Sequence, residues 1–97
     1  MITDGYQTGA ERSEVTLGAV VEGFPEWAVW RSDAGRVWAT LRRGLTGEEW
    51  EAGCSRTVDG DDARRLAEAL EEQRRRQAEA RRLRRLRETA ARRGAAS

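Results

Sequence analysis

The sequence offers few side chains that could carry out catalysis. It contains no His, so it lacks the commonest general base and metal ligand of enzymes. Its single cysteine, Cys54, therefore has no imidazole to activate it, and we interpret it as a small structural residue rather than a thiolate nucleophile. We predict that the protein is not an enzyme.

Two sequence patterns resemble sites for metals or phosphates but are incomplete. Asp59, Asp61 and Asp62 resemble half of a calcium-binding loop, yet the Glu near the twelfth position of such a loop is missing. We interpret these side chains as caps for a following helix. Gly44 and Gly47 are not followed by the Gly-Lys-Ser or Gly-Lys-Thr ending of a phosphate-binding loop. We expect no metal and no cofactor.

The strongest functional feature is a basic segment at the C-terminal end. Residues 73–97 contain 10 of the 18 basic residues, all of them Arg, and only two acidic residues, Glu79 and Glu88. Residues 1–72 carry an excess of acidic side chains. Guanidinium groups in such a row suit phosphates and carboxylates, although phosphate contacts alone give no sequence specificity. The protein is therefore predicted to have an acidic body and a basic arm.

The arm also carries an apolar stripe, and this leaves its role open. Leu83, Leu86 and Ala90 follow helical spacing, so the arm could enter an acidic or apolar groove of a protein partner, or pair with a second copy in a homodimer. Direct, weakly sequence-specific nucleic-acid binding is the alternative, and a merely solvated helix is the third. The candidate contact residues are Arg74, Arg75, Arg81, Arg82, Leu83, Arg84, Arg85 and Leu86, together with Trp30.

Trp30 enters this set because four tryptophans lie in a short chain. Exposed aromatic rings beside Arg31, Arg36, Arg42 and Arg43 could stack with unpaired bases. A chain this small needs large side chains for its core, however. We expect Trp27, Trp38 and Trp50 to lie in the core and Trp30 to be the exception.

The central elements are predicted from local patterns. Residues 26–32 and 36–41 are rich in aromatic and β-branched side chains and flank Ser-Asp-Ala-Gly, which predicts a β-hairpin with Gly35 at positive φ and allows Trp30 to pair with Trp38. Val15–Gly23 fits a short helix better than a strand, and Pro25 favours a boundary there. Thr46 and Glu49 form a capping-box pattern that starts another short helix, and residues 55–58 fit a brief extended segment.

A long helix is expected from Ala63. Ala63, Leu66, Ala67 and Leu70 share one face, which we expect to dock on the hairpin. Residues 71–82 contain no aliphatic side chain larger than Ala, so we expect this part of the helix to lie in solvent. At 100° per residue the later stripe that begins at Leu83 points roughly opposite to the docking face.

These elements define an α+β fold: a small β-hairpin of two to three antiparallel strands, packed on short helices, with a long C-terminal arginine-rich helix. We divide the chain into a flexible leader (1–14), a small α+β domain (15–73) and a basic helical arm (74–97) that frays from Gly94. With 38% hydrophobic and 36% charged residues the core must be small. The single cysteine and the absence of a signal peptide or a long apolar run favour a cytoplasmic protein without membrane contact.

The tryptophan-rich hairpin also resembles a known group of proteins. The run from Phe24 to Thr40, followed by Leu45-Thr46 and by Thr57-Val58-Asp59-Gly60-Asp61, is similar to small uncharacterised proteins of high-GC actinobacteria. The resemblance covers residues 15–73 and implies a fold and a source, but no assigned activity. A high-GC source also offers an explanation for the use of Arg without Lys, besides the chemistry of the guanidinium group.

Overall fold

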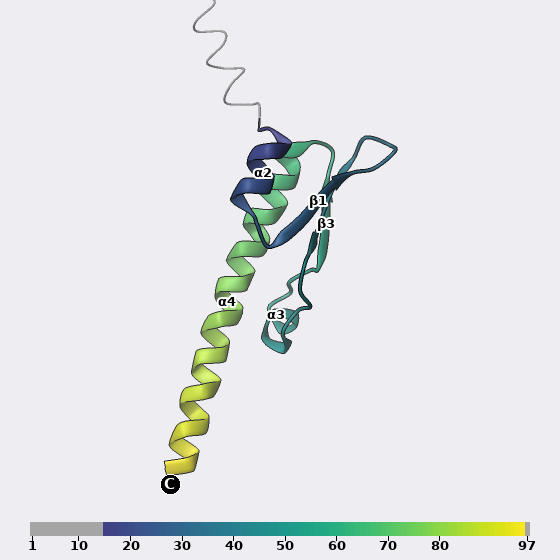
Figure 1. Cartoon of the computed structure of the whole chain (residues 1–97). Helices are drawn as coiled ribbons and strands as arrows, with labels where there is room; N and C mark the ends of the chain where they lie inside the picture. The colour runs from purple at the N-terminus through teal and green to yellow at the C-terminus, as the bar shows by residue number, and fades with distance from the viewer. Residues whose placement is uncertain (1–14, 97) are drawn as a thin grey trace, which may run out of the picture.

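The computed structural model describes residues 15–96 as a three-stranded sheet with three helices, one of which extends far beyond the others (Figure 1). The fold is α+β, as predicted. The elements in chain order are α2 (Leu17–Gly23), β1 (Trp27–Arg31), β2 (Val37–Leu41), α3 (Gly47–Glu51), β3 (Thr57–Gly60) and α4 (Ala63–Ala96).

The three strands form an antiparallel sheet in the order β1-β2-β3. The predicted hairpin is confirmed: Gly35 has a φ of 84°, and the Ser32 N–H donates to the Arg36 carbonyl at 2.8 Å across the turn. Trp30 lies opposite Trp38, and the two rings stack with their centroids 6.2 Å apart. The extended segment predicted over residues 55–58 is the edge strand β3, which begins at Thr57 and continues to Gly60, two residues beyond the predicted end.

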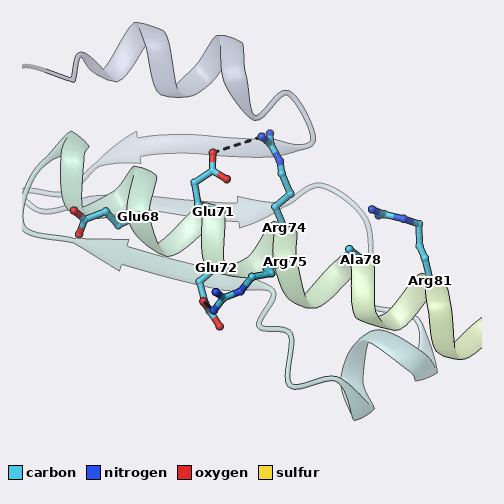
Figure 2. Close-up of a pocket in the computed structure, with 7 residues that line it drawn as sticks. All are labelled: Glu68, Glu71, Glu72, Arg74, Arg75, Ala78 and Arg81. Atoms are coloured by element: carbon cyan, nitrogen blue, oxygen red, sulfur yellow. Dashed lines mark hydrogen bonds and ion pairs between the residues drawn. The ribbon is translucent and has the colours of Figure 1, made fainter. Parts of the chain in front are cut away.

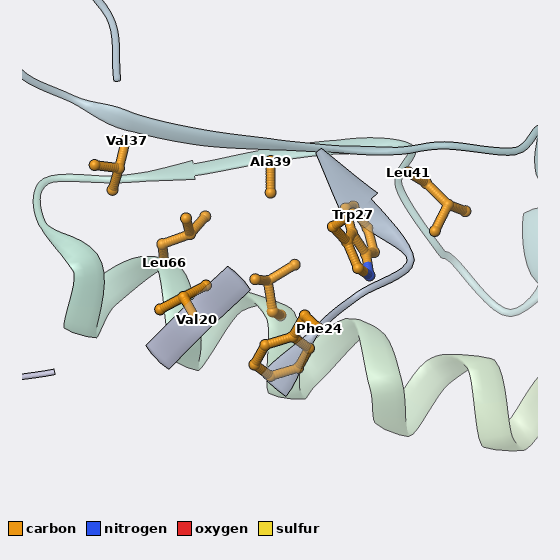
Figure 3. Close-up of a cluster of buried hydrophobic side chains, with 8 residues drawn as sticks. Val20, Phe24, Trp27, Val37, Ala39, Leu41 and Leu66 are labelled. Atoms are coloured by element: carbon orange, nitrogen blue, oxygen red, sulfur yellow. The ribbon is translucent and has the colours of Figure 1, made fainter. Parts of the chain in front are cut away.

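The core lies between one face of the sheet and the two helices α2 and α4. Alternate residues of the strands point to this face, because side chains alternate along a β-strand. Figure 3 shows these side chains between the sheet and the helices. The buried cluster consists of Val20, Phe24, Trp27, Val37, Ala39, Leu41, Leu66 and Leu70. The predicted docking face of the long helix is confirmed at Leu66 and Leu70, both fully buried.

The docked part of α4 is longer than we expected. Asp62 caps the helix, because its Oδ1 accepts the Arg65 N–H at 2.9 Å. Gln73, Gln77 and Ala80 are then buried in turn, so the stretch that we expected in solvent packs on the body. The apolar spacing does not predict this burial, because two of the three side chains are polar. Gln73 is held by a local partner: its Oε1 accepts the Ser55 N–H at 2.8 Å.

The short helix α3 begins as predicted, but it does not place Trp50 in the core. Its capping box is complete, with reciprocal bonds between Thr46 and Glu49. Trp50 is 74% exposed, whereas Glu49 of the same helix is buried. A five-residue helix has only one side against the body, and the Glu49 carboxylate occupies that side because Arg43 and the Thr46 N–H bind it there. The expected place of Trp50 in the core is therefore wrong. That of Trp38 is wrong as well, because Trp38 stacks on Trp30 on the sheet face away from the helices and lies outside the buried cluster.

The two ends of the chain were expected to be loosely ordered. The leader expected over residues 1–14 lies outside the described residues, and so does Ser97. Helix α4 passes through Gly94, where we expected fraying, and ends at Ala96. Within residues 15–96, none of the helices has the length and apolar character needed to cross a membrane.

Candidate partner-binding surface

The long helix α4 carries its candidate residues past the body of the protein. At a rise of about 1.5 Å per residue, its 34 residues span about 51 Å. Figure 1 shows α4 running past α3 and continuing alone to its end. The body contacts α4 as far along as Arg87, which reaches α3. About the last two turns of α4 therefore extend beyond the body of the protein.

Two arginines of α4 fix α3 against the helix. The Arg87 guanidinium donates to both carboxylate oxygens of Glu51, at 2.9 and 2.6 Å, and to Glu48 at 3.4 Å. The hydrogen bonds from Arg87 lower the pKa of the Glu51 carboxyl below its ordinary value. Arg76 donates to the Gly53 carbonyl at 2.6 Å, just after α3. The orientation of α4 relative to α3 is therefore held from two points.

Exposed apolar side chains adjoin the paired residues of this joint. Trp50 and Leu86 are the chain neighbours of the paired residues Glu51 and Arg87, and they are 74% and 63% exposed. They are the two most exposed large hydrophobic residues in the described part of the chain. Leu83, one turn before Arg87, is half-buried. We call Trp50, Leu83 and Leu86 the apolar end patch.

A second feature of α4 is a stripe of arginines on a different side. Arg74, Arg81, Arg85 and Arg92 follow one another at intervals of seven, four and seven residues. At 100° per residue they lie within about 40° of each other, and about 150° away from Leu83 and Leu86. We call these four residues the arginine stripe. The exposed part of α4 thus has an apolar side and a basic side.

The members of the arginine stripe differ in how far they are engaged. Arg74 donates to the Gly23 carbonyl at 2.7 Å, and its Cζ lies 4.2 Å from the centre of the Phe24 ring. It also forms an ion pair with Glu71 at 3.5 Å. Arg81, Arg85 and Arg92 have no ion-pair partner among residues 15–96. These three are therefore the most available cations of the arm.

The other predicted arginines of the arm are paired with acidic residues of the same helix. Arg82 lies 4.0 Å from Glu79, and Arg84 lies 3.4 Å from Glu88. Arg75 pairs with Glu72. Such exposed pairs contribute little to stability, but they reduce the positive charge on their side of α4. The predicted set is therefore divided into free and partly neutralised cations.

Trp30 and part of its basic neighbourhood are engaged within the fold. Trp30 is 44% exposed on the sheet face away from the helices, but one face of its ring is stacked on Trp38. Arg36 donates to Asp59 at 3.0 and 2.7 Å and also bonds Asp61. Two of the four arginines that we considered for this role, Arg36 and Arg43, are thus committed to carboxylates.

Two further features of the described residues are a charged depression on α4 and the buried thiol of Cys54. Figure 2 shows the side chains that line a depression along α4, with three carboxylates nearer the start of the helix and three guanidinium groups further along. Cys54 is buried. The pKa of its thiol is raised, mainly by burial and to a smaller extent by the negative charge of Glu49. Among residues 15–96 there is no cluster of three or more acidic or cysteine residues able to hold a metal. The residues lining the depression are Glu68, Glu71, Glu72, Arg74, Arg75, Ala78 and Arg81.

Two residues of this surface, Trp50 and Arg87, are absent from the candidate set predicted from the sequence. Trp50 was assigned to the core because of its size, and nothing in the local pattern places it outside. Arg87 was omitted from the candidate set although it is the side chain that joins α4 to α3. The available signal was the acidic composition of α3, whose Glu48 and Glu51 both pair with Arg87.

Comparisons with known proteins give this surface no precedent. Neither a protein-family model, nor a curated protein, nor a solved structure matches the chain.

Proposed function

We propose that the protein acts by binding another protein through the apolar end patch. The observation that supports this is the exposure of Trp50 and Leu86 at the joint between α3 and α4. Large aromatic and aliphatic side chains that remain in water beside a rigid joint are typical of binding sites. Tryptophan and arginine are also the side chains most enriched among residues that dominate binding energy.

The proposed partner carries an apolar groove with an acidic rim. Residues 81–93 contain seven Arg and only one acidic residue, Glu88, so the end of α4 is strongly basic around its apolar side. Complementary charge on the partner accelerates encounter and disfavours basic competitors. A small accessory or regulatory protein of this kind needs no catalytic residues, because its effect follows from occupying the groove of its partner.

Site-specific photo-crosslinking in the native host tests this proposal. A photoreactive residue replaces Trp50 in one variant and Leu86 in a second, and Thr40 on the far side of the sheet serves as the matched control position. We expect the same partner to be captured from positions 50 and 86 and not from 40. Changing Leu83 to Gln in the Leu86 variant should reduce capture at least about tenfold, as expected when one residue of a binding centre is removed.

Two results would contradict the protein-binding proposal. One is capture of unrelated proteins from positions 50 and 86, and the other is equal capture from position 40. Circular dichroism of each variant shows that the fold is retained, which is expected because positions 50 and 86 are exposed.

The arginine stripe supports one alternative function, namely binding of nucleic acid through phosphates. Three free arginines on one side of α4 give a slope of about −2.7 in the logarithm of affinity against the logarithm of salt concentration for duplex DNA. Affinity for a labelled duplex should then fall roughly 40-fold between about 50 and about 200 mM salt. The change Arg85→Gln should make this slope shallower by about 0.9, whereas Leu86→Gln should leave it unchanged. Absence of binding at the lower salt concentration would reject this alternative.

A further inference from the structure

Strand β1 is an edge of the sheet with unused hydrogen-bonding groups. The sheet order places β2 on one side of β1 and no strand on the other side among residues 15–96. Bonds from the Ser32 N–H to Arg36 and from the Arg42 N–H to Glu26 show that even-numbered residues of this segment bond to β2. Because bonding directions alternate along a strand, Val29 and Arg31 direct their N–H and C=O groups outward.

Strand β1 has neither a bulge nor a proline, two devices by which natural sheets keep their edges from pairing. Its only charged residue, Arg31, stands at its last position. Strand β1 pairs with β2 in an unbroken register over all five of its residues, and its sequence is Trp-Ala-Val-Trp-Arg. The backbone groups of Val29 and Arg31 have no other partner within the described residues.

The strand is also complementary to itself when a second copy runs antiparallel. With Val29 at the two-fold axis, Val29 bonds to its own counterpart, and Trp30 lies directly opposite Ala28 of the second copy. A large and a small side chain then meet on the outer face of the sheet, at a position where opposed side chains approach closely. Arg31 lies opposite Trp27 of the second copy in this register, so the pairing extends over all five residues of both strands.

Exposed apolar groups on both sides of this edge support the same arrangement. Trp30 is 44% exposed on the outer face of β1, and Val21 is 44% exposed on α2, the helix that packs against β1. We infer that the chain forms a homodimer by antiparallel pairing of β1 with β1 of a second copy, which creates a continuous six-stranded sheet. This inference is independent of the proposed function of the apolar end patch, which lies on α3 and α4.

Cysteine crosslinking tests the strand register. Val29→Cys is made in a Cys54→Ser background, with Thr40→Cys on the central strand β2 as the control. Opposed residues of a bonded antiparallel pair have Cα atoms about 5.5 Å apart, which is within the range of a disulfide. We expect the Val29→Cys protein to form a covalent dimer at least about ten times faster than the Thr40→Cys protein under mild oxidation.

Light scattering over a range of protein concentrations tests the dimer without a crosslink. Wild-type protein should be dimeric, and Val29→Pro should weaken dimerisation at least about tenfold, because two symmetric hydrogen bonds are lost. The Val29 N–H does not serve the β1–β2 ladder, so proline is tolerated there as on other edge strands. Monomeric wild-type protein at all concentrations, or equal crosslinking of the two cysteine variants, would overturn the inference.

Discussion

Replacement of Gly60 by Ala should destabilise the protein by about 2 to 3 kcal/mol, because the new methyl group has no space. A Cβ atom at this position would lie 2.6 Å from the Leu66 nitrogen and 2.9 Å from the Arg65 carbonyl carbon. Both atoms belong to the backbone in the first turns of α4, so no side chain can rotate away. Strand β3 and α4 would have to separate at the place where Leu66 enters the core.

Thermal and urea unfolding followed by circular dichroism measure this effect. A loss of about 2 kcal/mol corresponds to a fall of roughly 8 to 16 °C in Tm for a domain of this size. Gly44→Ala is the matched control, because a Cβ at Gly44 meets nothing within 4 Å. Equal stability of the two variants would show that the close contact between β3 and α4 is not required.

Gly60 illustrates which features a sequence does not disclose. Its sequence context favours a turn, because Asp59, Asp61 and Asp62 surround it and glycine is common in turns. The structure places it at the end of β3, where it allows the helix to approach. Turn preference is a local property, whereas the distance between a strand and a helix depends on the whole fold. The sequence therefore shows that position 60 is a glycine, but it does not show that the close approach of α4 is what requires one.

The elements that were predicted correctly are those with local physical causes. The hairpin turn needs a residue at positive φ, and Gly35 supplies it. The capping box needs only Thr46 and Glu49 at a spacing of three residues. The docking of α4 on the body was predicted only for its apolar part. Its continuation through Gln73 and Gln77 could not be predicted, because burial of a polar side chain depends on partners such as the Ser55 N–H, 18 residues away.

The candidate surface was predictable to a similar degree. Helical spacing identifies Leu83 and Leu86 as a stripe on the side opposite to the docking face, and Leu86 is indeed well exposed. The sequence does not show that Arg87 pairs with Glu51, which is 36 residues away and places Trp50 at the same end. It also does not distinguish free arginines such as Arg85 from paired ones such as Arg84, because the pairing depends on side-chain positions.

Replacement of Glu49 by Gln should remove about 2 to 3 kcal/mol of stability at pH 7, and this loss should depend on pH. The Glu49 carboxylate is nearly buried and accepts hydrogen bonds from both terminal nitrogens of Arg43 at 2.7 Å and from the Thr46 N–H at 2.9 Å. The bonds from Arg43 are the largest cause of its low pKa, which falls from an ordinary value of 4.5 to about 2. Glutamine keeps the shape of the side chain but not its charge.

The direction of the pH dependence follows from this lowered pKa. A carboxyl group with a lower pKa in the folded state contributes its full stabilisation above the unfolded value of 4.5, and the contribution is lost as the pH falls towards about 2. The difference in unfolding free energy between wild type and Glu49→Gln should therefore be constant from pH 7 to about 5.5 and shrink below it. Glu48→Gln, which removes the same charge from the same helix, is the control. A difference that stays constant down to about pH 2.5 would mean that Glu49 stabilises α3 by its shape rather than by its charge.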